Sequence, residues 1–159
     1  MKATNHDSFK LECRQIKSEM TYELRKKVLW PHIKNDDYSL ESDIANETFH
    51  LGVYFKKKII SIGTFVKEQN DKIDYTKQYR LRAMATSYET RGKGAGRLLI
   101  EMSLELLKKK KIDILWCSSR INAVGFYHSL GMIEIPKLYF IKNIGYHKTM
   151  YIELKKWKK

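Results

Sequence analysis

Hydrophobic and polar residues alternate along several stretches of the chain, and this pattern predicts short β-strands. In Thr48–Phe55 every second side chain is hydrophobic, and a further run, Ile59–Val66, follows after the lysine-rich tip Lys56–Lys58. Two such runs so close together predict a β-hairpin. The other strands that we expect are Phe9–Ile16, Tyr79–Thr86, Ile112–Cys117, Met132–Ile135, Leu138–Ile141 and His147–Leu154.

Hydrophobic residues spaced three to four positions apart predict helices between some of these strands. The longest such pattern covers Gly92–Leu107. A shorter helix is expected from Ser18, which can cap it, and another over Ile121–Leu130, where Gly131 suits a left-handed C-terminal cap. The polar stretch His32–Glu47 is expected to be a loop with at most a short helical turn.

The order of these elements is β-α-loop-β-β-β-α-β-α-β-β, with no internal repeat and no linker. It predicts a mixed α/β fold around one central sheet, with a strand–helix–strand crossover at its middle. The chain has 159 residues, of which 43% are hydrophobic. A chain of this length buries roughly 70% of its unfolded surface, so we expect a single domain over residues 1–159.

Several classes of protein are disfavoured by the composition. The longest hydrophobic stretch falls far short of the roughly 20 residues that a membrane-spanning helix needs, and the first residues lack a hydrophobic signal core. Cys13 and Cys117 are too few for a disulfide scaffold or a cysteine-based zinc site. We therefore expect a cytoplasmic protein with no metal site and no membrane partner.

The chain is strongly basic, with 31 Lys and Arg against 18 Asp and Glu and a net charge of +13. Such a charge attracts polyanions, including nucleic acid and phosphate-rich cofactors. Much of the excess positive charge lies in runs that are typical of solvated helix ends and turns. The charge is therefore compatible with an anionic partner but does not identify one. The runs that carry it are Arg25–Lys27, Lys56–Lys58, Lys108–Lys111 and Lys155–Lys159.

A glycine-rich segment, Arg91-Gly92-Lys93-Gly94-Ala95-Gly96-Arg97, lies between a strand and the longest helix. Glycines let the backbone turn sharply and approach a ligand, and the first N–H groups of a helix favour an anion such as pyrophosphate. The dinucleotide fingerprint does not fit, because Arg97 stands where its third glycine should be, and the Walker loop lacks its Lys-Ser/Thr pair.

Two segments of the sequence resemble motifs of the GNAT superfamily of N-acetyltransferases. Arg91-x-x-Gly94-x-Gly96 resembles its [Q/R]-x-x-G-x-[G/A] signature, and the run from Asn122 to Met132 resembles its N-x-x-x-x-F-Y-x-x-x-G-F segment, with Met132 in place of phenylalanine. The resemblance implies the GNAT-like acyl-CoA N-acyltransferase fold. In that fold, about four helices flank a central mixed, mostly antiparallel sheet of about six to seven strands.

The resemblance also implies acetyl-CoA as co-substrate and assigns roles to residues. Backbone N–H groups of the glycine-rich segment hold the pyrophosphate in the family, and the pantetheine arm lies beside the end of the fourth strand. Tyr127 matches a tyrosine near the thioester sulfur, where it either donates a proton to the leaving thiolate or stabilises it by a hydrogen bond. The residues expected to bind the cofactor are Met84, Ala85, Thr86, Arg91, Gly92, Lys93, Gly94, Ala95, Gly96, Arg97, Asn122 and Phe126.

The group that removes the proton from the acceptor amine is less clearly marked. A lysine-like amine is mostly protonated at neutral pH and must lose a proton before it attacks. His50 and His147 are the candidate bases that we retain, next to Asp43 and Glu89. Proton removal through a chain of water molecules is common in the family and needs no single base.

The function expected is transfer of the acetyl group of acetyl-CoA to a primary amine, directly, in a ternary complex. The alternative is a non-catalytic module that binds CoA or nucleic acid through its basic surface. Tyr127 favours the enzyme, because a binding module needs no hydroxyl at the thioester, and nucleic acid is disfavoured as a partner. Cys117 lies in a strand that looks packed, which disfavours a covalent route. The sequence leaves open whether the protein forms a homodimer.

The acceptor itself carries no signature in the sequence. The positive charge argues against very basic acceptors unless the cleft is locally acidic. A run of acidic residues in the expected acceptor loop offers that acidity. Its members are Asp36, Asp37, Glu41, Asp43 and Glu47.

Overall fold

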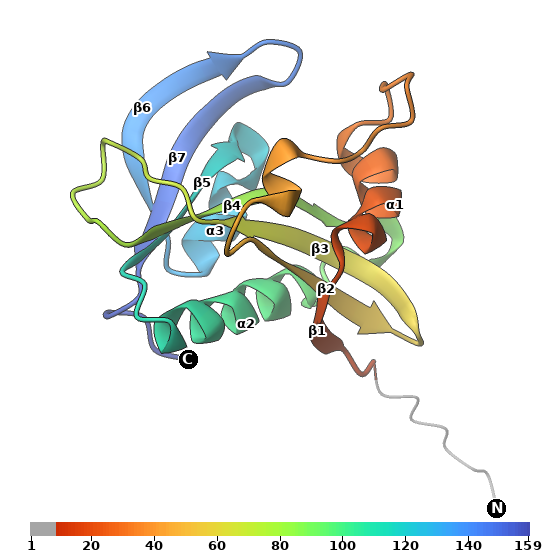
Figure 1. Cartoon of the computed structure of the whole chain (residues 1–159), viewed down its shortest axis with the longest axis horizontal. Helices are drawn as coiled ribbons and strands as arrows, with labels where there is room; N and C mark the ends of the chain where they lie inside the picture. The colour runs from red at the N-terminus through yellow and green to blue at the C-terminus, as the bar shows by residue number, and fades with distance from the viewer. Residues whose placement is uncertain (1–8) are drawn as a thin grey trace, which may run out of the picture.

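A seven-stranded β-sheet runs through the computed structural model, which describes residues 9–159 (Figure 1). The strands lie in the spatial order β1-β2-β3-β4-β5-β7-β6. Every neighbouring pair is antiparallel except β4 and β5, which are parallel. The expected mixed, mostly antiparallel sheet is therefore confirmed. The strands are β1 (Glu12–Ile16), β2 (Phe49–Phe55), β3 (Lys58–Val66), β4 (Gln78–Thr86), β5 (Ile114–Arg120), β6 (Ile133–Ile141) and β7 (Gly145–Glu153).

Helix α2 (Ala95–Lys109) connects the parallel strands β4 and β5 and covers one face of the sheet, here called the α2 face (Figure 1). Its buried residues Leu99 and Leu104 belong to the main hydrophobic core together with Leu51, Phe65 and Leu81 of the sheet. Burial of each large side chain contributes about 1.5–3 kcal/mol. Helix α3 (Val124–Ser129) adds its side chains to the same core.

The opposite face of the sheet, here called the α1 face, is covered by the segment that begins at Ser18. The expected helix is composite: a 3₁₀ turn over Ser18–Thr21 leads into α1 (Tyr22–Leu24) and then into a π-helical stretch, Arg25–Leu29. Leu24 packs here in a second, smaller core. Further 3₁₀ turns lie at Glu41–Ile44, Tyr88–Thr90 and Ile121–Ala123.

The remaining differences from the predicted elements have local causes. Helix α2 begins at Ala95 instead of Gly92, because Gly92 and Gly94 have φ of 77° and 88°. The two strands expected around Pro136 are one strand, β6, whose register with β7 shifts between Glu134 and Leu138. No helix in the described part of the chain is long and apolar enough to cross a membrane.

The turn between β2 and β3 consists of two lysines with left-handed backbone. Lys56 has φ 46° and Lys57 has φ 67°. Positive φ at both central residues is the requirement of the type I′ turn, which matches the twist of a β-hairpin. Glycine adopts this conformation without the strain that a Cβ imposes. The hairpin is thus closed by residues that are poorly suited to its turn.

We therefore expect Lys57→Gly to stabilise the protein by about 0.5–1 kcal/mol, which raises Tm by roughly 1–4 °C. The measurement is thermal unfolding followed by circular dichroism. The matched control is Lys58→Gly, which removes the next lysine from the extended strand β3 and should lower Tm. If Lys57→Gly lowers Tm as much as Lys58→Gly does, the strain at this turn is refuted.

Candidate active site

The parallel strands β4 and β5 pair over only part of their lengths. Residues Gln78–Leu81 of β4 lie opposite Ile114–Cys117 of β5. Beyond this point β4 pairs with β3 alone and β5 with β7 alone. A bulge marks the parting: Ala83 has φ 47°, and the register between β3 and β4 shifts between Ile62 and Thr64. The β4 backbone after Leu81 thus presents an unpaired edge, to which an extended ligand can add as a strand would.

The glycine-rich loop follows this edge after the 3₁₀ turn Tyr88–Thr90 and ends in the first turn of α2. Gly94 is the N-cap residue, and no side chain caps the helix within the described residues. Of the described atoms, none lies within 4 Å of where a Cβ would stand on Gly92 or Gly94. The first N–H groups of α2, at the positive end of the helix dipole, thus have no side-chain cap from residues 9–159, which is the arrangement that binds phosphate groups.

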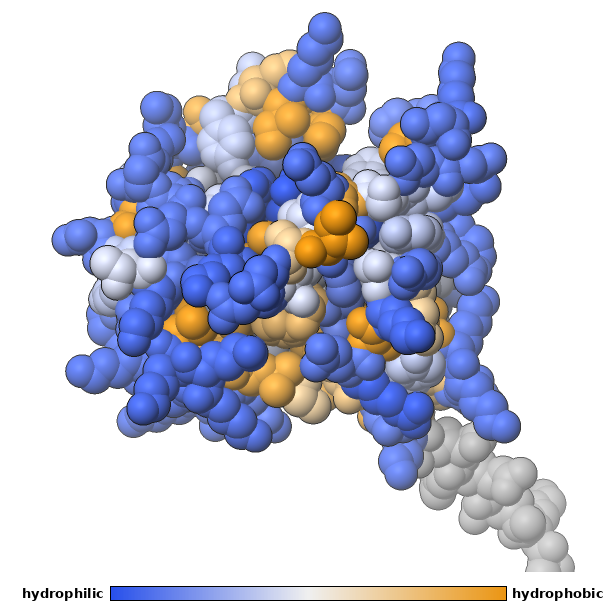
Figure 2. Space-filling model, viewed as in Figure 1, coloured by the Kyte–Doolittle hydropathy of each residue, from blue (hydrophilic) through white to orange (hydrophobic). Residues whose placement is uncertain are grey.

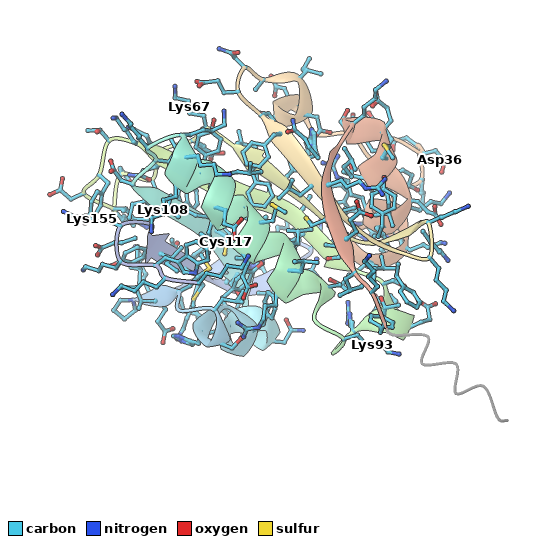
Figure 3. All side chains as sticks on the ribbon, turned by 90° about the horizontal axis from the view of Figure 1, so that it is seen from below. Asp36, Lys67, Lys93, Lys108, Cys117 and Lys155 are labelled. Atoms are coloured by element: carbon cyan, nitrogen blue, oxygen red, sulfur yellow. The ribbon has the colours of Figure 1, made fainter. Side chains whose placement is uncertain are left out.

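Arg91, Lys93 and Arg97 are the cations of this loop, and Lys108 lies far from it. Figure 3 shows Lys93 at one end of α2 and Lys108 at the other. The Arg91 guanidinium lies 4.3 Å from the centroid of the Tyr88 ring. Arg97 donates a hydrogen bond to the Ser129 carbonyl oxygen at 3.0 Å, which ties α2 to the end of α3.

Tyr127 lies where β4 and β5 part. Its side chain is buried, and its hydroxyl donates to Met84 Sδ on β4 at 3.6 Å. Burial raises the pKa of Tyr127 well above its usual value, and the neighbouring Cys117 thiol on β5 raises it further. The hydroxyl therefore sits between the two strands and keeps its proton at neutral pH.

Local structure fixes the position of Tyr127. Gly131 has φ 88° and donates its N–H to the His128 carbonyl, while the Met132 N–H reaches the Tyr127 carbonyl at 3.1 Å. These two bonds form a Schellman motif, so the left-handed C-cap expected at Gly131 is confirmed.

The structure brings several of the expected cofactor residues together. A Cβ on Gly96 would lie 3.1 Å from Met84 Cε and 3.2 Å from Phe126 Cζ, so all three residues are in contact. Ala85, by contrast, packs in the second core on the α1 face. The Thr86 hydroxyl bonds to Ser61 at 2.8 Å, and Asn122 is exposed just beyond the end of β5.

His50 belongs to a buried polar network on the α1 face. Arg25, fully buried, donates two hydrogen bonds to Asp43, at 2.7 and 2.8 Å, and a third to Thr64 Oγ1 at 2.8 Å. Thr64 Oγ1 lies 2.9 Å from His50 Nδ1. His50 Nε2 is 4.0 Å from Asp43 and has no hydrogen-bond partner among the described residues. Burial lowers the pKa of His50, against the opposing effect of Asp43, so its imidazole is held neutral.

The other expected base, His147, lies on β7 opposite Arg120 of β5. It is buried, and its Nδ1 donates to the Gly145 carbonyl oxygen at 2.8 Å. The rings of His147 and Tyr139 stack at 5.9 Å. Because β7 adjoins β5 while β3 separates β2 from β4, His147 lies nearer in the sheet to the parting than His50 does.

Asp43 and Glu89 are poorly suited to act as bases. Burial alone would raise the pKa of Asp43, but the hydrogen bonds from Arg25 and from the Leu40 N–H lower it overall. The hydrogen bond from Ser87 lowers the pKa of Glu89. Both carboxylates are therefore weak proton acceptors at neutral pH.

The acidic run of the expected acceptor loop is largely neutralised by cations. Asp43 pairs with Arg25, Asp36 lies 3.1 Å from Lys26, and Glu47 lies 2.5 Å from Lys67. Asp37 accepts hydrogen bonds from Ser39. Three of the five acidic side chains are thus paired with cations, which reduces the local acidity that a very basic acceptor would need.

Sequence reasoning missed the role of Arg25. It precedes two lysines, and in the sequence the three residues look like one solvated run. In the structure Lys26 and Lys27 make exposed ion pairs, whereas Arg25 is fully buried. No signal in the sequence separates the three, because the π-helical stretch that turns Arg25 inward was itself not predictable from the spacing.

Comparison with known proteins agrees with this architecture. Residues 17–154 match the family described as Acetyltransferase (GNAT) domain. The uncharacterized N-acetyltransferase YitI of Bacillus subtilis (strain 168) is 34% identical over 145 residues, covering 91% of this chain and 97% of YitI.

Solved structures share the fold at lower sequence identity. FeeM, an N-acyl amino acid synthase from uncultured soil microbes, superposes with a TM-score of 0.75 at 12% identity, covering 93% of this chain and 92% of FeeM. An acyl-CoA N-acyltransferase from Pseudomonas aeruginosa superposes with a TM-score of 0.68 at 16% identity, covering 89% of this chain and 99% of that one.

A mixed sheet whose central parallel pair parts beside a glycine-rich helix start is the fold of acyl-CoA N-acyltransferases. The family match and the identity to YitI carry this further: the chain belongs to the GNAT acetyltransferase family. It is an acyltransferase, and the fold implies an acyl-CoA donor and an acceptor substrate.

The neutral state of His50 makes the stability of the protein depend on pH. The pKa of His50 is lowered in the folded protein, whereas in the unfolded chain it is about 6.5. Below that pH the unfolded state binds more protons, so the free energy of unfolding falls as the solution is acidified. We expect His50→Asn to reduce the loss of Tm between about pH 7.5 and pH 5.5.

The measurement is thermal unfolding at a series of pH values. His32→Asn, the same change at an exposed histidine, is the matched control. If the Tm of His50→Asn depends on pH as strongly as that of the control, the assignment of this pH dependence to His50 is contradicted.

Proposed function

We propose that this enzyme transfers the acetyl group of acetyl-CoA to a primary amine of its acceptor, directly, with both substrates bound at once. One observation carries the proposal: the unpaired edge of β4 is followed, after one short 3₁₀ turn, by a glycine-rich loop and a helix N-terminus whose geometry suits phosphate groups. An extended pantetheine arm and a pyrophosphate are joined in CoA in the same order.

The residues present fit acetyl-CoA. The backbone N–H groups from Gly92 to Arg97 would hold the pyrophosphate, supported by the charges of Arg91 and Lys93. The edge at Met84, Ala85 and Thr86 would pair with the amide groups of the pantetheine arm. Phe126, in contact with Gly96, would line the arm, and the exposed Asn122 would donate to it.

Acetyl-CoA, when bound, supplies the acetyl thioester that the amine attacks, with CoA thiolate as the leaving group. Tyr127 then stabilises the developing negative charge on sulfur by donating a hydrogen bond. Its raised pKa favours this role over full proton transfer, because a thiol has a pKa near 8.5 and a tyrosine of raised pKa is the weaker acid.

Direct transfer is favoured over a covalent route through cysteine. Burial raises the pKa of Cys117 to about 12, although a hydrogen bond with Tyr127 opposes the change. Burial likewise raises the pKa of Cys13, to about 11. Thiols with such pKa values are almost wholly protonated at neutral pH and are poor nucleophiles.

We propose that the proton of the acceptor amine leaves through water, with His147 as the better placed of the two histidines to receive it. It lies on β7, beside the parted end of β5. His50 is separated from β4 by β3, and its free Nε2 is shielded from solvent. A general base must reach its proton directly or through one water molecule.

The alternative, a module that binds without catalysis, is disfavoured for two reasons. Family membership identifies an acyltransferase, and Tyr127 places a hydroxyl between the two parted strands, where a module that only binds has no use for one.

The loop assignment is tested by a pair of variants at Gly94 that differ only in charge. Asn and Asp both tolerate the left-handed backbone that Gly94 adopts at φ 88°. We expect Gly94→Asp to weaken acetyl-CoA binding about tenfold or more relative to Gly94→Asn, because a negative charge near the pyrophosphate is repelled.

Isothermal calorimetry with acetyl-CoA gives the two dissociation constants. Gly145→Asp is the control, since Gly145 also has a positive φ and open space at its Cβ position but is the first residue of β7. Equal affinities of Gly94→Asp and Gly94→Asn would refute the pyrophosphate site.

The role of Tyr127 is tested by removing its hydroxyl alone. Tyr127→Phe should lower kcat about tenfold to a thousandfold, while the dissociation constant of acetyl-CoA changes by less than about twofold. Tyr79→Phe is the matched control: Tyr79 is also buried on the α2 face, but its hydroxyl bonds to the Glu47 carbonyl. A Tyr127→Phe enzyme with the kcat of the control would exclude this role.

A further inference from the structure

Three guanidinium groups lie close to one another on the α1 face of the sheet, and within residues 9–159 two of them form ion pairs with carboxylates. Arg25 is paired with Asp43 at 2.7 Å. Arg80 is paired with Glu68 at 2.8 Å, and its guanidinium packs 4.7 Å from the Trp116 ring centroid. Both carboxylates are thus engaged by other arginines, and Arg82 is left as the cation in excess.

Arg82 has one weak contact to its charged group. Its Nη1 donates to Ser42 Oγ at 3.5 Å, the limit of a hydrogen bond. Within residues 9–159, no carboxylate lies at ion-pair distance from it. The side chain is partly buried, and this burial, followed by the repulsion from Arg80, lowers its pKa. A partly desolvated cation without a counterion is costly, and an anion would relieve that cost.

Arg82 also lies at the parting of the strands. It directly follows Leu81, the last residue of β4 that pairs with β5. Met84, which contacts the Tyr127 hydroxyl, is two residues further on, a separation of about 7 Å along a strand. Arg82 therefore lies on the α1 side of the parted strands, and the Tyr127 hydroxyl approaches the same parting from the α2 side.

A cavity on the α1 face lies beside Arg80, two residues before Arg82 in β4. The cavity has a volume of about 380 Å³, and Asp71, Lys72 and Arg80 are among the residues that line it, whereas Arg82 lies outside the lining. The segment of residues 67–77 borders it; this segment lies beside β6 and β7 in Figure 1. Hydrophilic side chains cover most of the surface seen in Figure 2. An acceptor with a polar, charged end is the occupant that suits such surroundings.

We propose, on the basis of the acetyl transfer proposed above, that Arg82 binds a carboxylate of the acceptor, and that the acceptor is an amine of the amino-acid class. The guanidinium group presents paired N–H donors that match the two oxygens of a carboxylate. The amine of the same molecule then faces the thioester. Arg80, fixed by Glu68 and Trp116, adds positive potential without being the primary partner.

The experiment compares acetyl transfer from acetyl-CoA to free amino acids and to the same amino acids as carboxamides, which keep the amine and lose the negative charge. The enzymes are the wild type, Arg82→Gln, Arg82→Lys and, as control, Arg14→Gln, an exposed arginine on β1. Release of CoA thiol gives kcat and KM for each acceptor, and calorimetry gives acetyl-CoA binding.

For the wild type we expect kcat/KM about 10- to 100-fold higher for the carboxylate than for its carboxamide. Arg82→Gln should abolish this preference by raising KM for the carboxylate alone, with acetyl-CoA binding and the carboxamide rate unchanged. Arg82→Lys should retain part of the preference, and Arg14→Gln all of it.

Two different failures are distinguishable. Equal rates with carboxylates and carboxamides, or a preference that Arg82→Gln leaves intact, would overturn the role of Arg82 while acetyl transfer stands. No transfer to any amine by a wild type that binds acetyl-CoA would overturn the acetyl transfer, and the acceptor assignment with it.

Discussion

The parting of β4 from β5 is the constraint on which the rest of the site depends. Ala83, with its left-handed backbone, interrupts β4 just after its last pair with β5, so the two strands separate inside an otherwise continuous sheet. An unpaired strand edge in the middle of a sheet is costly unless something pairs with it. The edge, the glycine-rich loop and the Tyr127 hydroxyl all meet at this one point, because β4 leads into the loop and α3 begins just after β5.

The two faces of the sheet differ in the side chains that they carry. The α2 face is apolar and holds the helix whose N-terminus attracts phosphate. The α1 face combines a small hydrophobic core around Leu24 with charged side chains, of which Arg25 and Asp43 form a buried ion pair. A buried pair such as Arg25 with Asp43 is weak evidence for stability, since desolvation offsets much of its attraction. The pair has two effects on geometry here. Through Thr64 it joins the 3₁₀ turn at Glu41–Ile44 to β3, and it engages the carboxylate that would otherwise balance the charge of Arg82.

Local patterns gave correct predictions where the chain contacts itself at short range. The β2–β3 hairpin, helix α2 and the C-cap at Gly131 follow from spacing and glycine placement, because turns and periodic faces are decided within a few residues. The composite helix from Ser18 and the single strand β6 did not follow. A π-helical stretch and a strand that continues through Pro136 are stabilised by tertiary contacts that local propensity does not contain.

The sequence by itself determined the class of enzyme, because the glycine-rich segment that resembles the family motif is contiguous and its glycines act on their own backbone. It determined Tyr127 as a candidate for the same reason, through a motif within one short helix. The tertiary structure alone decided which charges are free. Arg25, Arg80 and Arg82 are equivalent cations in the sequence, and only the packing of β2, β3 and β4 against the segments around them shows that two are paired and one is not. Electrostatic pairing depends on distance in space, which the order of residues does not record.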